Sequence, residues 1–121
     1  MLRIIALLAL ILFASACGQR EEAAITTEAE LRAELHELRV AVQGAEHEAN
    51  RALKYARLSE ISAAIERIDE TEAQALEWSQ QALDLGWTRS QVREAYIDIN
   101  IERILDGRVA LQKQQAVLRS R

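Results

Sequence analysis

The chain has 121 residues, a formal net charge of −4 at pH 7, 50% hydrophobic residues, one cysteine and no proline. This length allows at most one small domain, and a single cysteine excludes an intramolecular disulfide. The absence of proline favours long helices over a turn-rich β fold, and an acidic chain without a basic run argues against nucleic-acid binding.

The first sixteen residues have the three parts of a secretory signal peptide. Arg3 is the positive start, residues 4–13 are an uninterrupted apolar run, and residues 14–16 have small side chains. A ten-residue helix covers about 15 Å, roughly half the hydrocarbon thickness of a bilayer, so this run is too short to span a membrane. We therefore expect residues 1–16 to be cleaved off directly before Cys17.

The only cysteine of the chain stands at this predicted cleavage site. The segment FASAC, residues 13–17, resembles the lipobox of bacterial lipoproteins, although Ala14 stands where that family most often has leucine. The resemblance implies that the lipoprotein signal peptidase cuts between Ala16 and Cys17. It also implies a diacylglyceryl group on the thiol of Cys17 and an acyl chain on its amine, and several chains make a stable anchor.

Two other outcomes remain open for this segment. Residues 14–16 also fit the A-x-A site of the ordinary signal peptidase, which would release a soluble periplasmic protein, and an uncleaved N-terminal anchor is the third possibility. We expect the lipoprotein, since the single cysteine occupies the position that a lipoprotein requires. Gly18, in place of the aspartate that retains enteric lipoproteins in the inner membrane, favours the outer membrane, facing the periplasm. Residues 17–26 then form the lipidated cysteine and a polar tether.

A helical domain is expected over residues 27–121. Thr27 and Glu30 form a capping-box pair that begins a helix over about 27–68. Apolar side chains recur along it at spacings of four and three residues, a heptad pattern typical of coiled coils. This seam consists of Leu31, Leu35, Leu38, Val42, Ala45, Ala49, Ala52 and Ala56. We expect it to contact another envelope protein or a second copy of the chain.

Two further helices are predicted, over about 71–85 and 88–118. The apolar stripe shifts phase around Leu58, and Thr71 and Thr88 are both suited to begin a helix with a capping box. Gly86 is placed for a left-handed C-cap between the two helices. We therefore predict an all-α fold, either a long helical hairpin or a three-helix bundle with coiled-coil character, preceded by the cleaved signal peptide.

The stretch YIDINIERIL, residues 96–105, has features of both a strand and a helix. Its isoleucines alternate as in a strand, but the chain has no second run of this kind to pair with it, so we interpret it as helix. A helix here has two apolar faces and is expected to pack between partners. One face holds Ile97, Ile101, Ile104 and Leu111, and the other holds Val92, Tyr96 and Ile99.

Residues that could carry chemistry are few. His36 and His47 are eleven residues apart, which puts them on one side of a helix but about 16 Å from each other, too far to share a metal ion. The acidic side chains stand at helix-pairing distances from basic ones, as in Glu28–Arg32 and Glu48–Arg51. We predict no catalytic residue, metal site, cofactor or small-molecule substrate.

The two tryptophans stand on either side of the turn at Gly86. Trp87 is expected to pack on the flanking helices and close this turn. For Trp78, packing in the domain and exposure as an anchor for a partner or membrane both remain open.

Residues 45–53, AEHEANRAL, resemble the Ala-rich coiled coils of Braun-type outer-membrane lipoproteins. Those proteins join peptidoglycan through a C-terminal lysine. This sequence ends Arg119-Ser120-Arg121, and its lysines, Lys54 and Lys113, are internal, so covalent attachment to the wall by that route is not predicted.

The expected function is that of a lipid-anchored, non-enzymatic helical protein of the bacterial envelope, acting as a spacer, adaptor or accessory subunit. Its expected partners are the membrane, through Cys17, and another envelope protein or itself. The alternatives are a soluble periplasmic binding or inhibitor module and an exclusion or lysis lipoprotein of a mobile element.

Overall fold

The computed structural model describes residues 27–121, and this part of the chain is all-α. The predicted signal peptide, the Ala16–Cys17 cleavage site and the tether lie outside the described residues. Four helices and no strand occur within 27–121, which confirms the all-α prediction for this range. The helices are α1 (Glu28–Tyr55), α2 (Leu58–Asp84), α3 (Arg89–Asp98) and α4 (Ile101–Arg119).

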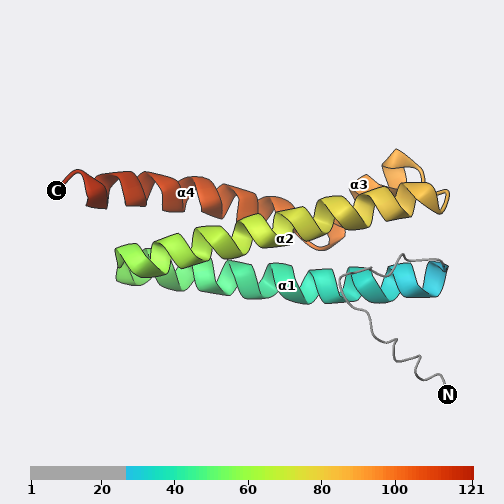
Figure 1. Ribbon diagram of the computed structural model, residues 1–121, viewed down its shortest axis with the longest axis horizontal. Coiled ribbons are helices and arrows are strands. Elements are labelled where there is room, and N and C mark those ends of the chain that lie inside the picture. Colours follow the sequence, from blue (N-terminus) through green and yellow to red (C-terminus); the bar gives the residue numbers. More distant parts are fainter. Residues whose placement is uncertain (1–26) are drawn as a thin grey trace, which may run out of the picture.

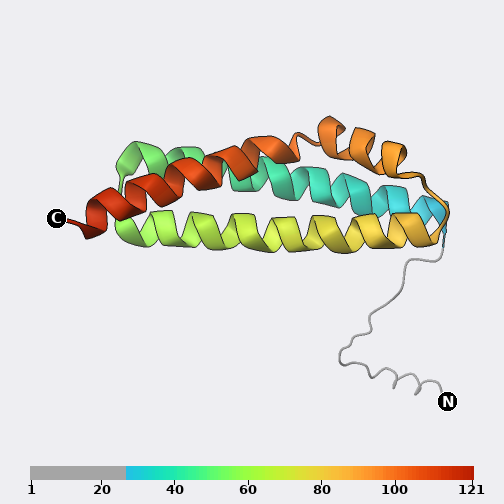
Figure 2. The same cartoon turned by 90° about the horizontal axis from the view of Figure 1, so that it is seen from above.

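The helices form a bundle of three rods (Figure 1). α1 and α2 make an antiparallel hairpin, and α4 runs antiparallel to α2 while packing against both. Figure 2 shows α3 on the same side of the hairpin as α4 and at an angle to it. The third rod is therefore made of two pieces, and the described chain begins at one end of the bundle and finishes at the other.

The core is a continuous set of buried apolar side chains from all four helices. Its largest fully buried members are Leu31, Val42, Ile61, Ile68, Ile104 and Leu111. Burying one aliphatic side chain of this size contributes about 1.5–3 kcal/mol, so this set is the main source of stability.

Two predicted caps and one predicted turn are present. The Thr27 and Thr88 hydroxyls accept hydrogen bonds from the backbone N–H groups of Glu30 and Gln91, each at 3.1 Å. In turn, the side chains of Glu30 and Gln91 accept from the backbone N–H groups of Thr27 and Thr88. Gly86, between α2 and α3, has φ 103°, a value at which a side chain would strain the backbone. These residues begin and separate the helices as the sequence predicts.

The end of the first helix differs from the expected position near residue 68. The chain turns at Ala56, which has φ 52° and donates its N–H to the Ala52 carbonyl at 2.9 Å. α2 then continues without a break past Thr71, whose hydroxyl donates to the Arg67 carbonyl at 2.9 Å instead of capping a new helix. The break expected at 69–70 is therefore wrong, and the hairpin turn lies thirteen residues earlier.

The last helix is interrupted, whereas one helix over 88–118 was expected. Asn100 has φ 60° and separates α3 from α4. The break lets Ile99 and Ile101 both reach the core, where they are 2% and 4% exposed. Side chains two positions apart on a continuous helix point to nearly opposite sides, so an unbroken helix would expose either Ile99 or Ile101. Ile97, expected on the buried face, is 66% exposed instead.

Candidate functional site

The predicted seam lies inside the bundle. Six of its members are buried, Leu35 is partly buried, and Ala56 forms the turn after α1. Small residues allow a close approach of α1 and α4, since a Cβ added to Gly107 would lie 3.8 Å from the Ala49 Cβ. α2 and α4 of the same chain cover this side of α1, so a contact with a partner has to use another surface.

Both tryptophans fasten the start of α1 to the turn between α2 and α3. Trp78 is 3% exposed, and its indole N–H donates to the Leu31 carbonyl at 2.9 Å. Trp87 lies edge-on to it, with ring centroids 5.5 Å apart, and donates to Glu28 Oε1 at 3.0 Å. The Arg32 guanidinium stacks 5.1 Å from the Trp87 centroid and pairs with Glu28 at 2.7 Å. We call Trp78, Trp87, Glu28 and Arg32 the tryptophan clasp.

The contacts in the tryptophan clasp define the structural role of each tryptophan and lower the pKa of Glu28. Trp87 closes the turn as expected, and Trp78 is a packed core residue and not an exposed anchor. The hydrogen bond from Trp87 and the hydrogen bond and charge of Arg32 lower the pKa of Glu28 below its ordinary value of 4.5. A carboxylate that is charged at neutral pH therefore holds the clasp together.

Charged side chains connect α1 with each of the other three helices, and α2 with α4. These bridges are mostly solvent-exposed, so each contributes at most about 1 kcal/mol and mainly fixes the register of the helices. The predicted Glu28–Arg32 pair is confirmed, whereas Glu48 pairs with Arg67 of α2 rather than with Arg51. The inter-helix pairs are Glu48–Arg67 at 3.2 Å, Glu46–Arg103 at 3.1 Å, Asp98–Arg39 at 2.6 Å, Asp69–Arg108 at 2.5 Å and Glu72–Arg108 at 2.8 Å.

The side chains that could bind a metal ion lie apart from one another in the described part of the chain. His36 and His47 are both exposed on α1. Within residues 27–121 no three His, Cys, Asp or Glu side chains come together in a way that could hold a metal ion. None of these four helices is long and apolar enough to cross a membrane.

An apolar groove of about 600 Å³ lies where α2, α3 and α4 meet. Leu76 of α2 and Ile97 of α3 line it and are 60% and 66% exposed, the highest values among the large hydrophobic side chains described. Tyr96 is held beside them by its hydroxyl, which donates to the Ala75 carbonyl at 2.8 Å. We call this feature the α2–α3–α4 groove.

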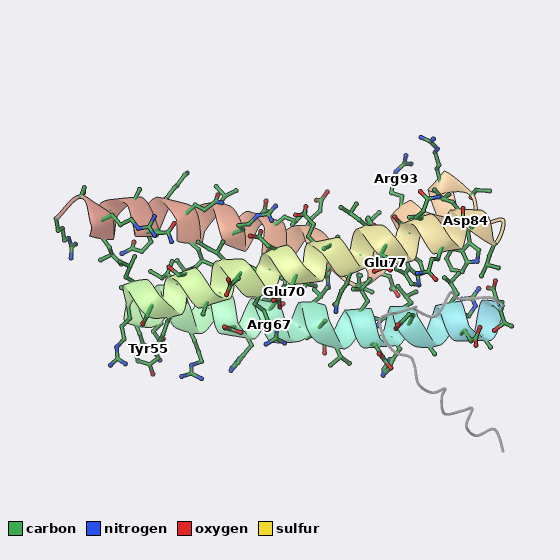
Figure 3. All side chains as sticks on the ribbon, in the orientation of Figure 1. Tyr55, Arg67, Glu70, Glu77, Asp84 and Arg93 are labelled. Atoms are coloured by element: carbon green, nitrogen blue, oxygen red, sulfur yellow. The ribbon has the colours of Figure 1, made fainter. Side chains whose placement is uncertain are left out.

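Five charged side chains line this groove, and two of them, Glu72 and Arg103, form ion pairs with Arg108 and Glu46. Arg93 stands on α3, where its side chain points away from the bundle (Figure 3), and Glu102 and Asp106 stand on the first turns of α4. None of the ion pairs within residues 27–121 involves these three side chains. The sequence pattern did not reveal the groove, because it forms only where the break at Asn100 turns Ile97 out of the core.

No protein-family model matches the sequence, and neither curated proteins nor solved structures give a significant match.

Proposed function

We propose that this protein is a lipid-anchored, non-enzymatic helical protein of the bacterial envelope that acts as a spacer or adaptor. The observation that carries the proposal is the position of Cys17, the only cysteine, directly after an apolar run and three small residues. The helical bundle begins ten residues later, at Thr27, so the lipid and the domain are separate parts of the chain.

The adaptor contact is assigned to the α2–α3–α4 groove, with a second copy of the chain as its occupant. A two-fold axis through the groove would bring the Arg93 side chain of one copy opposite Glu102 and Asp106 of the other. The same arrangement would cover Leu76 and Ile97 in both copies. The charge pattern is thus complementary to itself, which favours self-association over capture of an unrelated partner.

The lipid anchor is tested by the intact mass of the protein extracted from bacterial membranes, beside a Cys17→Ser variant. We expect a mass above that of residues 17–121 by a diacylglyceryl group and an acyl chain, and no such increase in the variant. The unmodified mass of residues 17–121 in the soluble fraction would overturn the lipoprotein assignment.

Self-association is tested by sedimentation equilibrium of residues 17–121 carrying Cys17→Ser. We expect a dimer that Ile97→Gln weakens and that Val40→Gln, at a 54% exposed position on α1, leaves unchanged. Arg93→Glu should weaken the dimer as well, and adding Asp106→Arg to it should restore the dimer. A monomer at all concentrations, or equal effects of the Ile97 and Val40 variants, would overturn the groove contact.

A soluble periplasmic binding or inhibitor module is the second candidate, because Ala14-Ser15-Ala16 also fits the ordinary signal peptidase. It predicts the same bundle and the same groove without the lipid. Release of the protein by mild washing of the cells, with the bare mass of residues 17–121, distinguishes it from the lipoprotein.

A further inference from the structure

The two ends of the bundle carry opposite charge. At the end where α1 turns into α2 and α4 finishes, residues 51–59 and 113–121 contain no acidic side chain. Their six basic residues are Arg51, Lys54, Arg57, Lys113, Arg119 and Arg121. At the other end, residues 27–37 and 77–98 contain eight acidic residues and three basic ones. We call the first of these the basic end.

Exposed apolar side chains lie among these cations. Tyr55, Leu58 and Val117 are 52%, 39% and 48% exposed. Figure 3 shows Tyr55 projecting from the end of α1, at the opposite end of the bundle from Asp84. The Gln115 amide donates to Ser62 Oγ at 3.1 Å, so the last turns of α4 lie against the first turns of α2. The three apolar side chains therefore lie at the same end of the bundle.

Favourable interactions with helix dipoles account for only some of the cations at the basic end. Lys54 and Arg119 stand in the last turns of α1 and α4, where a cation interacts favourably with the negative end of the helix dipole. Arg57 stands before the first turn of α2, where a cation is unfavourable, and it reaches Glu60 only at 3.5 Å. Among the described residues, it is the only one of the six with an ion pair. The other five cations form no ion pair with another described residue, and one of them, Lys54, lies with its Nζ 5.6 Å from the Tyr55 ring centroid, so their charge is available to an external partner.

We infer that the basic end binds the surface of a bilayer that contains anionic phospholipids. Arginine and lysine are attracted to the headgroup phosphates, and tyrosine and short aliphatic side chains enter the interface between headgroups and acyl chains. The exposed Tyr55, Leu58 and Val117 favour a bilayer over a hydrated anionic polymer, which offers apolar side chains no place to be buried.

The basic end lies far along the bundle from the residue at which the described chain begins. α1 has 28 residues and runs from the tether to the basic end, a length of about 42 Å. With the lipid of Cys17 in a membrane, the basic end would be a second, separate attachment to a bilayer surface. This step rests on the proposed function, whereas binding of the basic end to a bilayer does not.

Binding is tested with residues 17–121 carrying Cys17→Ser, since the whole described core lies within residues 27–121. The protein is sedimented with vesicles of phosphatidylcholine alone and with vesicles that also contain phosphatidylglycerol. We expect binding at least about tenfold stronger to the anionic vesicles, and a loss of this preference at high salt. Equal binding to both vesicles, or no binding at low salt, would overturn the inference.

Matched variants locate the binding surface. Arg57→Gln and Arg89→Gln each remove one cation beside a helix start, the first at the basic end and the second at the other end. We expect Arg57→Gln to weaken binding to anionic vesicles about fivefold, the effect of one cation near such a surface, and Arg89→Gln to leave it unchanged. Similarly, Tyr55→Ser should weaken binding and Val40→Ser should not. Circular dichroism confirms that each variant is folded, and equal effects within either pair would overturn the assignment.

The two proposals fail separately. These vesicle measurements use protein without a lipid, so a bare mass for the cellular protein would remove the anchor and leave them standing. Conversely, a lipidated protein whose unlipidated form ignores anionic vesicles would retain the anchor and lose the basic end as a binding surface.

Discussion

At the scale of single residues, hydrogen bonds from two indoles hold the start of α1 in place. Trp78 donates inside the core and Trp87 donates at the surface, although both rings belong to the same clasp. A buried hydrogen bond costs more to lose than an exposed one, since water replaces the exposed partner. The two tryptophans should therefore contribute unequally to stability.

Trp78→Phe should lower the free energy of unfolding by about 2 kcal/mol, through the lost bond to the Leu31 carbonyl and a small cavity. Trp87→Phe, the matched control, should lower it by less than about 1 kcal/mol, because its partner Glu28 is exposed. Urea unfolding followed by circular dichroism measures both. Equal losses of unfolding free energy would show that the buried hydrogen bond of Trp78 contributes no more to stability than the exposed one of Trp87.

A second prediction concerns Glu34, whose pKa is raised by burial and by the nearby carboxylates of Glu37 and Glu77. The folded state then holds this proton more tightly than the unfolded chain, so the charged form costs stability as the pH rises through the folded pKa. Glu34→Gln should raise the Tm at pH 7 and leave it unchanged well below the ordinary pKa of 4.5. Glu94→Gln controls for the lower overall acidity, and an equal rise of Tm in both variants would contradict the prediction.

Some residue roles could be predicted from the sequence, and others could not. Thr27 and Thr88 cap helices as expected, since each is followed three residues later by a side chain that returns the bond. Thr71 has the same spacing to Gln74, yet its hydroxyl bonds back to the Arg67 carbonyl. A threonine side chain fits both arrangements, and only the packing of α2 against its neighbours decides between them.

At the scale of elements, the helices break at two positions that the sequence analysis did not predict. The α1–α2 turn uses Ala56, and the α3–α4 junction uses Asn100, both with positive φ. Neither proline nor glycine stands at these sites, and the only local signs are the phase shift of the apolar stripe around Leu58 and the tolerance of asparagine for positive φ. Burial of side chains on both sides of each break outweighs the backbone cost, and this long-range effect cannot be seen in a short stretch of sequence.

Ala56→Gly should raise the free energy of unfolding by about 1 kcal/mol, because glycine adopts φ 52° without a Cβ contact. Gly86→Ala is the reciprocal change, and it should be destabilising because φ is 103° although no atom lies within 4 Å of the added Cβ. Thermal unfolding measures both variants. A loss of stability in Ala56→Gly would mean that the flexibility gained by the unfolded chain exceeds the relief of strain.

At the scale of the whole molecule, the heptad pattern of α1 predicts which side chains are buried but not what buries them. Leu31, Val42 and Ala45 are at most 1% exposed, yet α2 and α4 of the same chain cover them. A heptad seam has the same appearance whether its partner is another segment or another molecule. The surfaces left for partners, the groove and the basic end, arise from how the helices are assembled.

The bundle should open first at α3. This helix buries only Val92 and Ala95, at 9% and 8% exposure, whereas α1, α2 and α4 bury several side chains that are fully enclosed. Native-state hydrogen exchange should therefore give the amides of α3 a lower opening free energy than those of the three long helices.

Within α3, the amides should share one value, because the Asn100 junction and the turn at Gly86 separate it from its neighbours. Equal protection of α3 and α4 would show that the third rod unfolds as one unit in spite of its break. A dimer formed through the α2–α3–α4 groove would raise the protection of α3 with protein concentration, and Ile97→Gln would abolish that dependence.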